Sequence, residues 1–263
     1  MRRFTGLAAI AAVLLVPATG IAQDPVRVQE DPDCHAADRG DRYCEIREFE
    51  LPARSSLEVD AGPNGGIRVT GWDRDDVRLI ARVQATSRNG DPRDLVRSVE
   101  IRTGNVIDAS GPRGSRSSWA VSYELWVPRS TSLLLAAHNG GIRLDSLEGD
   151  VAARTTNGGI HLSGGAGRVR GETTNGGLHL ELVGPRWEGD GVDLRTTNGG
   201  VQIRVPDGYA ADLETGTVNG GMSLDIPITV QGPIGRTLRT ELGGGGALIR
   251  AMTTNGGVSI RGG

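Results

Sequence analysis

The tripeptide Asn-Gly-Gly occurs seven times in this chain of 263 residues, and each copy precedes a hydrophobic, a variable and a second hydrophobic residue. Four copies also follow a Thr-Thr pair, and from the second copy onward the spacings are 18, 18, 23, 21 and 36 residues. A short unit that recurs in this way predicts units stacked on one another rather than a globule built around one pocket. The asparagines, expected at structural corners, are Asn64, Asn139, Asn157, Asn175, Asn198, Asn219 and Asn255.

Hydrophobic residues alternate with polar ones on both sides of each asparagine. Around Asn157, for example, Val151 and Thr155 fall on one face before the corner, and Ile160 and Leu162 fall on the same face after it. Alternation with a period of two indicates β-strands that bury one face. Each unit is therefore predicted to be a strand, an Asn-Gly-Gly corner, a second strand and a turn.

Two all-β architectures fit this unit. In the favoured one, the units stack as parallel rungs of a repetitive β-solenoid, similar to a single-stranded β-helix. Rungs about 4.8 Å apart would then place opposite charges together in the column Arg154, Glu172 and Arg195, and would let each inner threonine donate to the next. In the alternative, Asn-Gly closes hairpins that pair Thr155 with Ile160 and build an antiparallel β-sandwich.

The N-terminus has the features of a signal peptide over residues 1–22. Arg2 and Arg3 precede an apolar run from Leu7 to Val16, and small residues around Ala22 suit cleavage there. No later stretch suits a membrane span better, so no transmembrane segment is expected after cleavage. Cleavage would take the formal net charge from −3 to −5, which argues against a nucleic-acid partner.

Cys34 and Cys44 are the only cysteines, and in an exported chain they are expected to form a disulfide within an N-terminal segment of residues 23–50. A metal site built from Cys34, His35 and Cys44 lacks a fourth ligand. Residues 51–263 are predicted to form one continuous β-solenoid domain.

Within this domain, Ser87 to Arg93 and Ser110 to Ser118 are expected to be loops. The 75 residues between Asn64 and Asn139 would fit about four further units. The final strand, Val258 to Arg261, has no obvious cap, which predicts a free edge able to pair with another chain.

Several segments carry a specific resemblance when taken together. They are Pro63 to Val77 (PNGGIRVTGWDRDDV), Tyr123 to Pro128 (YELWVP) and the run from Asn139 through Gly149-Asp150-Val151 to Gly159. From about residue 45 onward the chain resembles the bacterial DUF4097 family, whose members are labelled putative adhesins and are similar to head GIN adhesin-like domains. The resemblance implies an exported, β-solenoid-like protein, and it carries over no catalytic or binding residues.

Individual residues offer little support for catalysis or for a bound cofactor. His161 and His179 occupy equivalent positions one repeat apart, close to Glu181, but the series continues with Gln202, so a solvated polar column is favoured over a metal site. The segment from Glu188 to Asp193 is one copy of a calcium-like pattern that needs many copies. The outward threonine column lacks the second column that an ice-binding surface needs. We therefore expect no catalytic, cofactor-binding or metal-binding residues.

An enzyme acting on polysaccharide would need clustered acids and a cleft, and the outward positions show no paired carboxylates at one level. Four tryptophans could stack on sugars if exposed, although packing under loops is favoured: Trp72, Trp119, Trp126 and Trp187.

The sequence thus predicts an exported, non-enzymatic, adhesin-like scaffold in the periplasm, at the cell surface or secreted. It would display columns of polar side chains to an unidentified macromolecule or glycan of the cell envelope. The first alternative is a structural protein that forms homo-oligomers through its C-terminal edge, and the second is a polysaccharide-acting β-helix enzyme.

Overall fold

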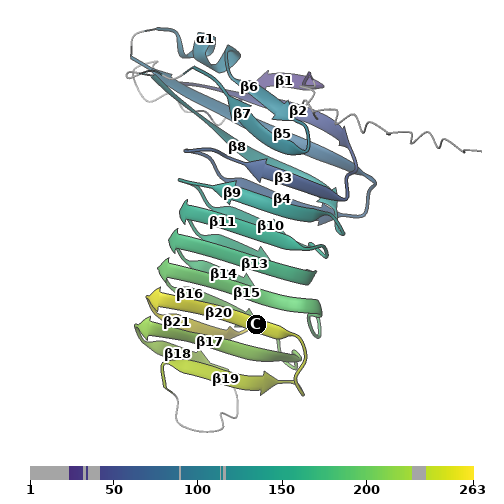
Figure 1. Cartoon of the computed structure of the whole chain (residues 1–263), viewed down its shortest axis with the longest axis vertical. Coiled ribbons are helices and arrows are strands. Elements are labelled where there is room, and N and C mark those ends of the chain that lie inside the picture. The colour runs from purple at the N-terminus through teal and green to yellow at the C-terminus, as the bar shows by residue number, and fades with distance from the viewer. Residues whose placement is uncertain are drawn as a thin grey trace, which may run out of the picture.

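Two large β-sheets lie face to face and form an elongated stack (Figure 1). The structure is a computed structural model that describes residues 24–31, 34, 42–88, 90–112, 114, 117–226 and 235–263. The predicted signal peptide, residues 1–22, lies outside the described residues, as does His35. In the described part of the chain the single helix is α1 (Pro92–Arg97), and no helix there has the length and hydrophobicity of a membrane span.

We call the two sheets A and B. In spatial order, sheet A contains β1 (Arg27–Glu30), β2 (Arg42–Pro52), β5 (Asp76–Ser87), β8 (Ser117–Pro128), β4 (Ile67–Trp72), β10 (Ile142–Asp145), β12 (Ile160–Ser163), β14 (Leu178–Glu181), β16 (Val201–Val205), β21 (Val258–Gly262) and β18 (Met222–Asp225). Sheet B contains β19 (Thr237–Leu242), β17 (Ala211–Asn219), β20 (Leu248–Asn255), β15 (Glu188–Asn198), β13 (Ala166–Asn175), β11 (Val151–Asn157), β9 (Ser132–Ala137), β3 (Ser56–Asp60), β7 (Val106–Ser110) and β6 (Glu100–Thr103).

At each Asn-Gly-Gly corner of the repeats the chain passes from sheet B to sheet A. Equivalent strands of neighbouring repeats pair in parallel and in register, so that Val151 lies opposite Val169 in sheet B and Ile160 lies opposite Leu178 in sheet A. The inner positions of both sheets are buried and form one core that runs the length of the stack; Ile160, for example, has no exposed surface. The alternating pattern of the sequence therefore reflects burial against the opposite sheet.

The all-β fold agrees with the sequence, and its layers are those of two open, mixed sheets. This arrangement fits the sandwich alternative, with one difference. The strands that flank a corner, such as β11 and β12, belong to different sheets instead of pairing as a hairpin, and the pairs between repeats are parallel. Thr155 consequently lies opposite Thr173, not opposite Ile160.

The first end of the stack is built from long antiparallel strands. β2 pairs with β5, and β5 pairs with β8, so residues before 51 continue sheet A. The expectation of about four further units between Asn64 and Asn139 is wrong. β4 lies directly beside β10, and the residues between β4 and β9 form β5, α1, β6, β7 and β8 at the end of the stack (Figure 1).

Part of the loop expected from Ser87 to Arg93 begins α1. Asp91 caps the helix by accepting a hydrogen bond from the backbone N–H of Arg93, and Pro92 occupies the first turn, where its missing N–H costs nothing. The buried guanidinium of Arg47 in β2 donates to the carbonyls of Val96 and Val99, 2.7 and 2.5 Å away, which ties the helix to sheet A.

The last repeat is not at the edge of the stack, and the prediction of a free C-terminal strand is wrong. β21 pairs with β16 on one side and with β18 on the other, and β20 lies between β15 and β17. After β18 the chain forms β19, which pairs antiparallel with β17, and then returns through Gly243 to Gly246 to fill the rung between its two predecessors. Because both edges of β21 are hydrogen-bonded, the strand cannot add another chain.

Candidate functional site

The outer surface of sheet A carries two rows of polar side chains where four repeats stack. We call this surface the polar face. Its strands β10, β12, β14 and β16 are in parallel register, so equivalent side chains lie about 4.8 Å apart along each row. The first row is Arg143, His161, His179 and Gln202, and the second is Asp145, Ser163, Glu181 and Arg204.

His161 and His179 stack on each other at the centre of the polar face. Their ring centroids are 4.2 Å apart and the ring planes differ by 9°. Burial lowers the pKa of His161, and the neighbouring His179 and Arg143 lower it further. Parallel stacked rings direct their nitrogens side by side rather than toward one point, so this geometry does not suit two imidazoles on a single metal ion.

Two shallow hollows cover most of sheet A and meet at Arg143 and His161. The first extends over the repeats to Gln202 and Ser259. The second extends toward the end of the stack, over Glu124 and Arg68 of β8 and β4 and as far as Gln29 of β1. The polar face is therefore part of one long, open surface.

Acidic groups on the polar face are spread among cations and hydroxyls. Glu181 lies 3.8 Å from Arg204, and both side chains are more than half exposed. Asp145 accepts a hydrogen bond from the Ser146 hydroxyl at 2.7 Å. Among the described residues no group of three or more His, Cys, Asp or Glu side chains has an arrangement that could hold a metal ion.

The repeat asparagines form a continuous ladder along one edge of the stack. From Asn139 onward, the side-chain amide of each asparagine donates to the side-chain oxygen of the asparagine before it in spatial order, over 2.7–3.0 Å. The spatial order is Asn64, Asn139, Asn157, Asn175, Asn198, Asn255 and Asn219. The ladder satisfies polar groups at the corners, a structural role that needs no ligand.

The inner threonines do not donate to one another as expected. Thr173 donates to the carbonyl of Gly158, and Thr196 to that of Gly176, each over 2.7 Å. Each of these hydroxyls therefore bonds to the backbone oxygen of the first glycine in the adjacent corner.

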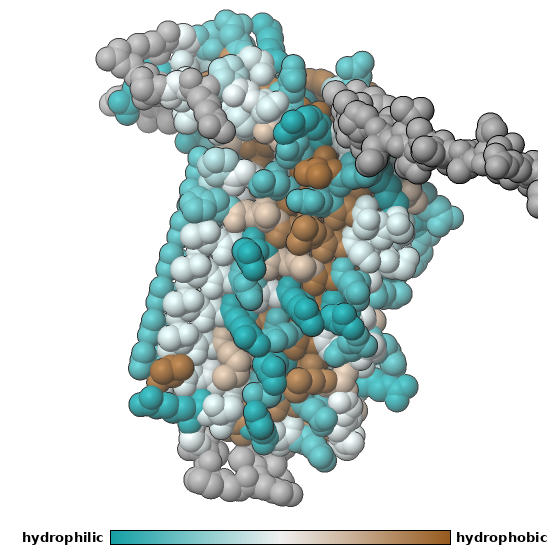
Figure 2. Space-filling model, viewed as in Figure 1, coloured by the Kyte–Doolittle hydropathy of each residue, from teal (hydrophilic) through white to brown (hydrophobic). Residues whose placement is uncertain are grey.

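Sheet B presents a different outer surface (Figure 2). Figure 2 shows hydrophilic residues over the repeats of this front sheet, with scattered hydrophobic patches among them. Arg154 and Glu172 form the expected ion pair at 3.0 Å, whereas Arg195 pairs with Asp193 of its own strand. Leu134 of β9 and Val106 of β7 are exposed hydrophobic residues on this sheet.

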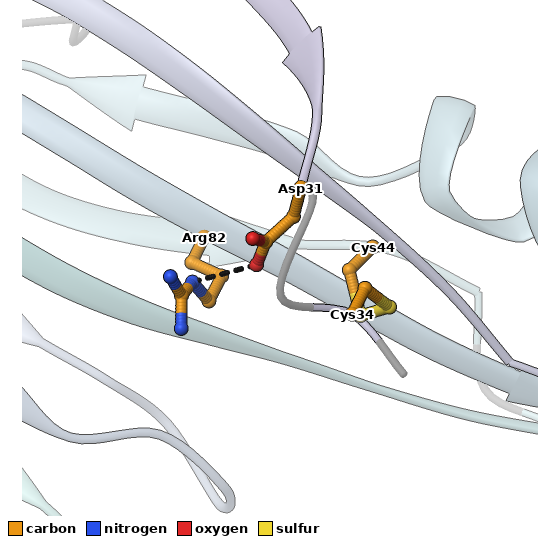
Figure 3. Close-up of a disulfide and its surroundings, with 4 residues drawn as sticks. All are labelled: Asp31, Cys34, Cys44 and Arg82. Carbon is orange, nitrogen blue, oxygen red and sulfur yellow. Dashed lines mark ion pairs between the residues drawn. A yellow bond between two sulfur atoms is a disulfide. The ribbon is translucent and has the colours of Figure 1, made fainter. Parts of the chain in front are cut away.

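A disulfide joins Cys34 to Cys44, as expected, and lies next to an ion pair at the first end of the stack (Figure 3). Asp31 is buried and lies 2.8 Å from Arg82 of β5. The disulfide and the ion pair together attach the start of the described chain to sheet A, through β2 and β5.

The tryptophans mostly serve local packing. Trp187 is buried and donates to the carbonyl of Gly167, and Trp119 donates to that of Pro112. Trp72 and Trp126 are half-buried, and each lies beneath a guanidinium. One face of each ring is therefore covered by an arginine.

The calcium-like segment begins β15 and its acidic groups are already paired. Glu188 lies 2.6 Å from Arg186, Asp190 contacts Arg168, and Asp193 lies 3.0 Å from Arg195. Carboxylates that are neutralised by arginine are poor ligands for a hard cation.

One feature of the polar face was not predicted from the sequence. The first row continues past Arg143 to Arg68, because β4 lies beside β10. The 75 residues between the two asparagines concealed this neighbour, and only the similarity of the Gly-Gly-Ile-Arg segments at Arg68 and Arg143 could have indicated it.

No protein-family model and no curated protein matches the sequence. Solved structures with a similar chain path include a putative cell adhesion protein from Clostridium sporogenes, with 9% identity and a TM-score of 0.44, covering 83% of this chain and 100% of the other. A putative adhesin from Bacteroides fragilis has 13% identity and a TM-score of 0.31, covering 82% and 96%. A putative lipid binding protein from Parabacteroides distasonis has 9% identity and a TM-score of 0.30, covering 85% and 95%. Membership of the DUF4097 family stays a prediction.

Proposed function

We propose that this protein is an exported, non-enzymatic scaffold that binds a glycan or another macromolecule of the cell envelope through its polar face. The repeats act as a β-solenoid-like stack that holds side chains at a fixed spacing. The observation that carries the proposal is the pair of straight polar rows around His161 and His179, set in an open hollow on strands whose backbone is fully paired. A rigid, preformed row of donors and acceptors binds with little loss of conformational freedom.

The polar face supports binding better than catalysis. A glycosidase keeps one carboxyl group protonated by burial or by a second carboxylate, and a second carboxylate acts across the scissile bond. Glu181 is exposed beside Arg204, and Asp145 is separated from it by the rung of Ser163. These surroundings favour hydrogen bonds with a polar ligand.

Export is supported by two features of the N-terminal part. The Cys34–Cys44 disulfide suits an oxidising compartment, and residues 1–22 have the composition of a signal peptide. Mass spectrometry of the protein recovered from its native envelope tests this part of the proposal. We expect the N-terminus to follow Ala22, and an intact Met1 would contradict it.

Binding can be tested with the purified protein against an array of envelope polysaccharides, peptidoglycan fragments and lipopolysaccharide. The variant His161→Ala/His179→Ala changes the polar face, and Arg154→Ala/Glu172→Ala changes sheet B in the same two repeats. We expect saturable binding that the histidine variant weakens about tenfold and the control leaves unchanged. Absence of saturable binding, or equal loss in both variants, would overturn the proposal.

A further inference from the structure

Four side chains that carry or can carry positive charge are direct neighbours in the first row, and His179 is the last of them. Arg68 of β4 lies opposite Arg143 of β10, and Arg143 lies opposite His161 of β12. Like charges at directly opposed positions of a sheet repel, and most sheets avoid them. The second row likewise places Arg204 opposite Arg261, whereas sheet B places Arg154 beside Glu172. The first row is thus an unfavourable arrangement that an anion would relieve.

The charges of this row are only weakly compensated. Arg143 is exposed and forms no ion pair with any of the described residues. Arg68 lies 3.5 Å from the carboxylate of Glu124, and both side chains are well exposed. The guanidinium of Arg143 therefore has free donors that point to solvent where the two hollows meet.

Five polar or charged side chains of sheet A surround His161. From β10 it faces Arg143 and Asp145, from β14 it faces His179 and Glu181, and Ser163 is its neighbour on β12. The two carboxylates belong to the second row: Glu181 lies 3.8 Å from Arg204, and Asp145 accepts a hydrogen bond from the Ser146 hydroxyl. Protonated His161 would therefore share the first row with Arg143, and that row contains no carboxylate between Arg68 and Gln202.

The shape of the site favours a polysaccharide over a peptide. β4, β10 and β12 lie within sheet A, so their backbone groups are already paired and cannot take up a peptide strand. The surface is open, polar and straight over three rungs. A linear polymer with repeated charges and hydroxyl groups can contact such a row through side chains alone.

We propose that Arg68, Arg143 and His161 form a binding site for the carboxylate or sulfate groups of an acidic polysaccharide, and that binding is coupled to proton uptake by His161. This inference rests on the proposed function and names its ligand class. The bidentate guanidinium suits both anionic groups. An anion beside Arg143 and His161 favours the imidazolium, so protonation of His161 and binding of the anion strengthen each other.

The direction of the pH effect follows from the same charges. In the free protein the pKa of His161 is lowered by burial, His179 and Arg143, so the ring is mostly neutral near pH 7. A bound anion raises that pKa. Affinity is therefore greatest at low pH and declines as pH rises through the pKa of His161 in the complex.

The experiment uses isothermal titration calorimetry of the whole protein with dextran sulfate, polygalacturonate and uncharged dextran at pH 5.5 and 7.5. Sulfate does not titrate in this range, so a pH effect with dextran sulfate belongs to the protein. We expect binding of the two acidic polymers only, at least about fivefold tighter at pH 5.5. Comparison of polygalacturonate with dextran sulfate shows whether the site prefers carboxylate or sulfate groups.

Three variants test the assignment. Arg143→Ala should weaken binding roughly 10- to 100-fold. Arg170→Ala removes another exposed arginine, from sheet B, and should leave affinity unchanged. His161→Gln, which reproduces the side chain present at Gln202, should remove the pH effect and retain binding at pH 7.5. Circular dichroism and thermal unfolding establish that each variant is folded.

The outcomes separate this inference from the proposed function. Equal binding of uncharged and acidic polymers, or equal effects of Arg143→Ala and Arg170→Ala, would overturn the inference and leave a neutral-glycan scaffold. A pH effect retained in His161→Gln would overturn the coupling to His161. Failure to bind any polymer, both here and in the envelope array, would overturn both proposals.

Discussion

The first glycine of each Asn-Gly-Gly corner is required by contact between neighbouring rungs. A Cβ atom at Gly199 would lie 2.1 Å from the carbonyl oxygen of Gly176, whereas a Cβ atom at Gly200 would lie 3.4 Å from that of Gly257. Two adjacent glycines of the same corner thus differ in whether they can be replaced by a residue with a Cβ atom. The difference comes from the approach of the next corner, which only the first glycine faces so closely.

This difference gives a matched pair of substitutions. Gly199→Ala should lower the free energy of unfolding by about 1–3 kcal/mol, because the corner must move away from Gly176. Gly200→Ala should change it by less than about 0.5 kcal/mol. Urea unfolding followed by circular dichroism measures both. Equal effects at the two positions would show that the corners do not approach one another so closely.

The asparagine ladder predicts that one Asn-to-Asp substitution destabilises the protein at neutral pH and not at low pH. Asn175 donates to Asn157 and accepts from Asn198, so the carboxylate of Asn175→Asp would face the Asn157 oxygen without a donor. The folded state would then raise the pKa of the new carboxyl group above its unfolded value of about 3.9. We expect a loss of about 1 kcal/mol at pH 7 that is recovered as pH falls through that raised pKa.

Asn64 provides the control, because in the ladder it only accepts, from Asn139. A carboxylate can still accept, so Asn64→Asp should be close to neutral at pH 7. Thermal unfolding of both variants and the parent from pH 3 to 7 makes the comparison. A similar pH profile for the two variants would contradict the donor and acceptor directions in the ladder.

At the scale of elements, the sequence predicted the strands better than their order. The period-two pattern and the corners identified the flanking strands, because burial and the tight corner act locally. The position of β20 and β21 could not be predicted, since each of the last five units offers the same inner threonine, asparagine and glycines to its neighbours. Asn219 could pair with Asn198 or Asn255 through identical hydrogen bonds, and connections made outside the repeats decide between them.

The candidate site was predicted only in part, because the sequence indicates contacts between evenly spaced repeats but not contacts made by distant segments. His161 and His179 lie on consecutive, evenly spaced repeats, so their contact followed from the spacing. Arg68 joins the row only because the residues between β4 and β8 fold onto the end of the stack. No local pattern encodes that placement.

Engineered disulfides test the order of the rungs. Gln202 lies opposite Ser259, and Ser259 lies opposite Ser223, so Gln202 and Ser223 are two rungs apart. Gln202→Cys/Ser259→Cys should form a disulfide on mild oxidation. Gln202→Cys/Ser223→Cys should not, because two rungs exceed the reach of a disulfide. Peptide mapping reads the result, and a cross-link in the second variant would show that the repeats stack in chain order.

As a whole, the molecule is an elongated stack in which each rung contacts only its neighbours, so its ends and its middle differ in what stabilises them. The first end depends on the Cys34–Cys44 disulfide and on the buried contacts of β2. A disulfide that closes so short a loop restrains the chain locally.

Removal of this disulfide should therefore have a local effect. In Cys34→Ser/Cys44→Ser we expect faster amide hydrogen exchange in β1 and the start of β2, with exchange in β11 to β16 unchanged. Hydrogen exchange with mass spectrometry resolves these segments. Uniformly faster exchange along the stack would show that the two ends are coupled more strongly than neighbour contacts allow.

The inserted position of β20 and β21 has a consequence for synthesis of the chain. Residues 211–225 leave the ribosome before residues 248–262, while the edge formed by β15 and β16 is already available to them. The nascent Asn219 unit therefore meets its wrong neighbour first, with matching hydrogen bonds, and the native order requires that contact to open or to be delayed. Assembly of the final two rungs should thus be slower than growth of the rest of the stack. Pulse-labelled hydrogen exchange during refolding would measure when the amides of each rung become protected.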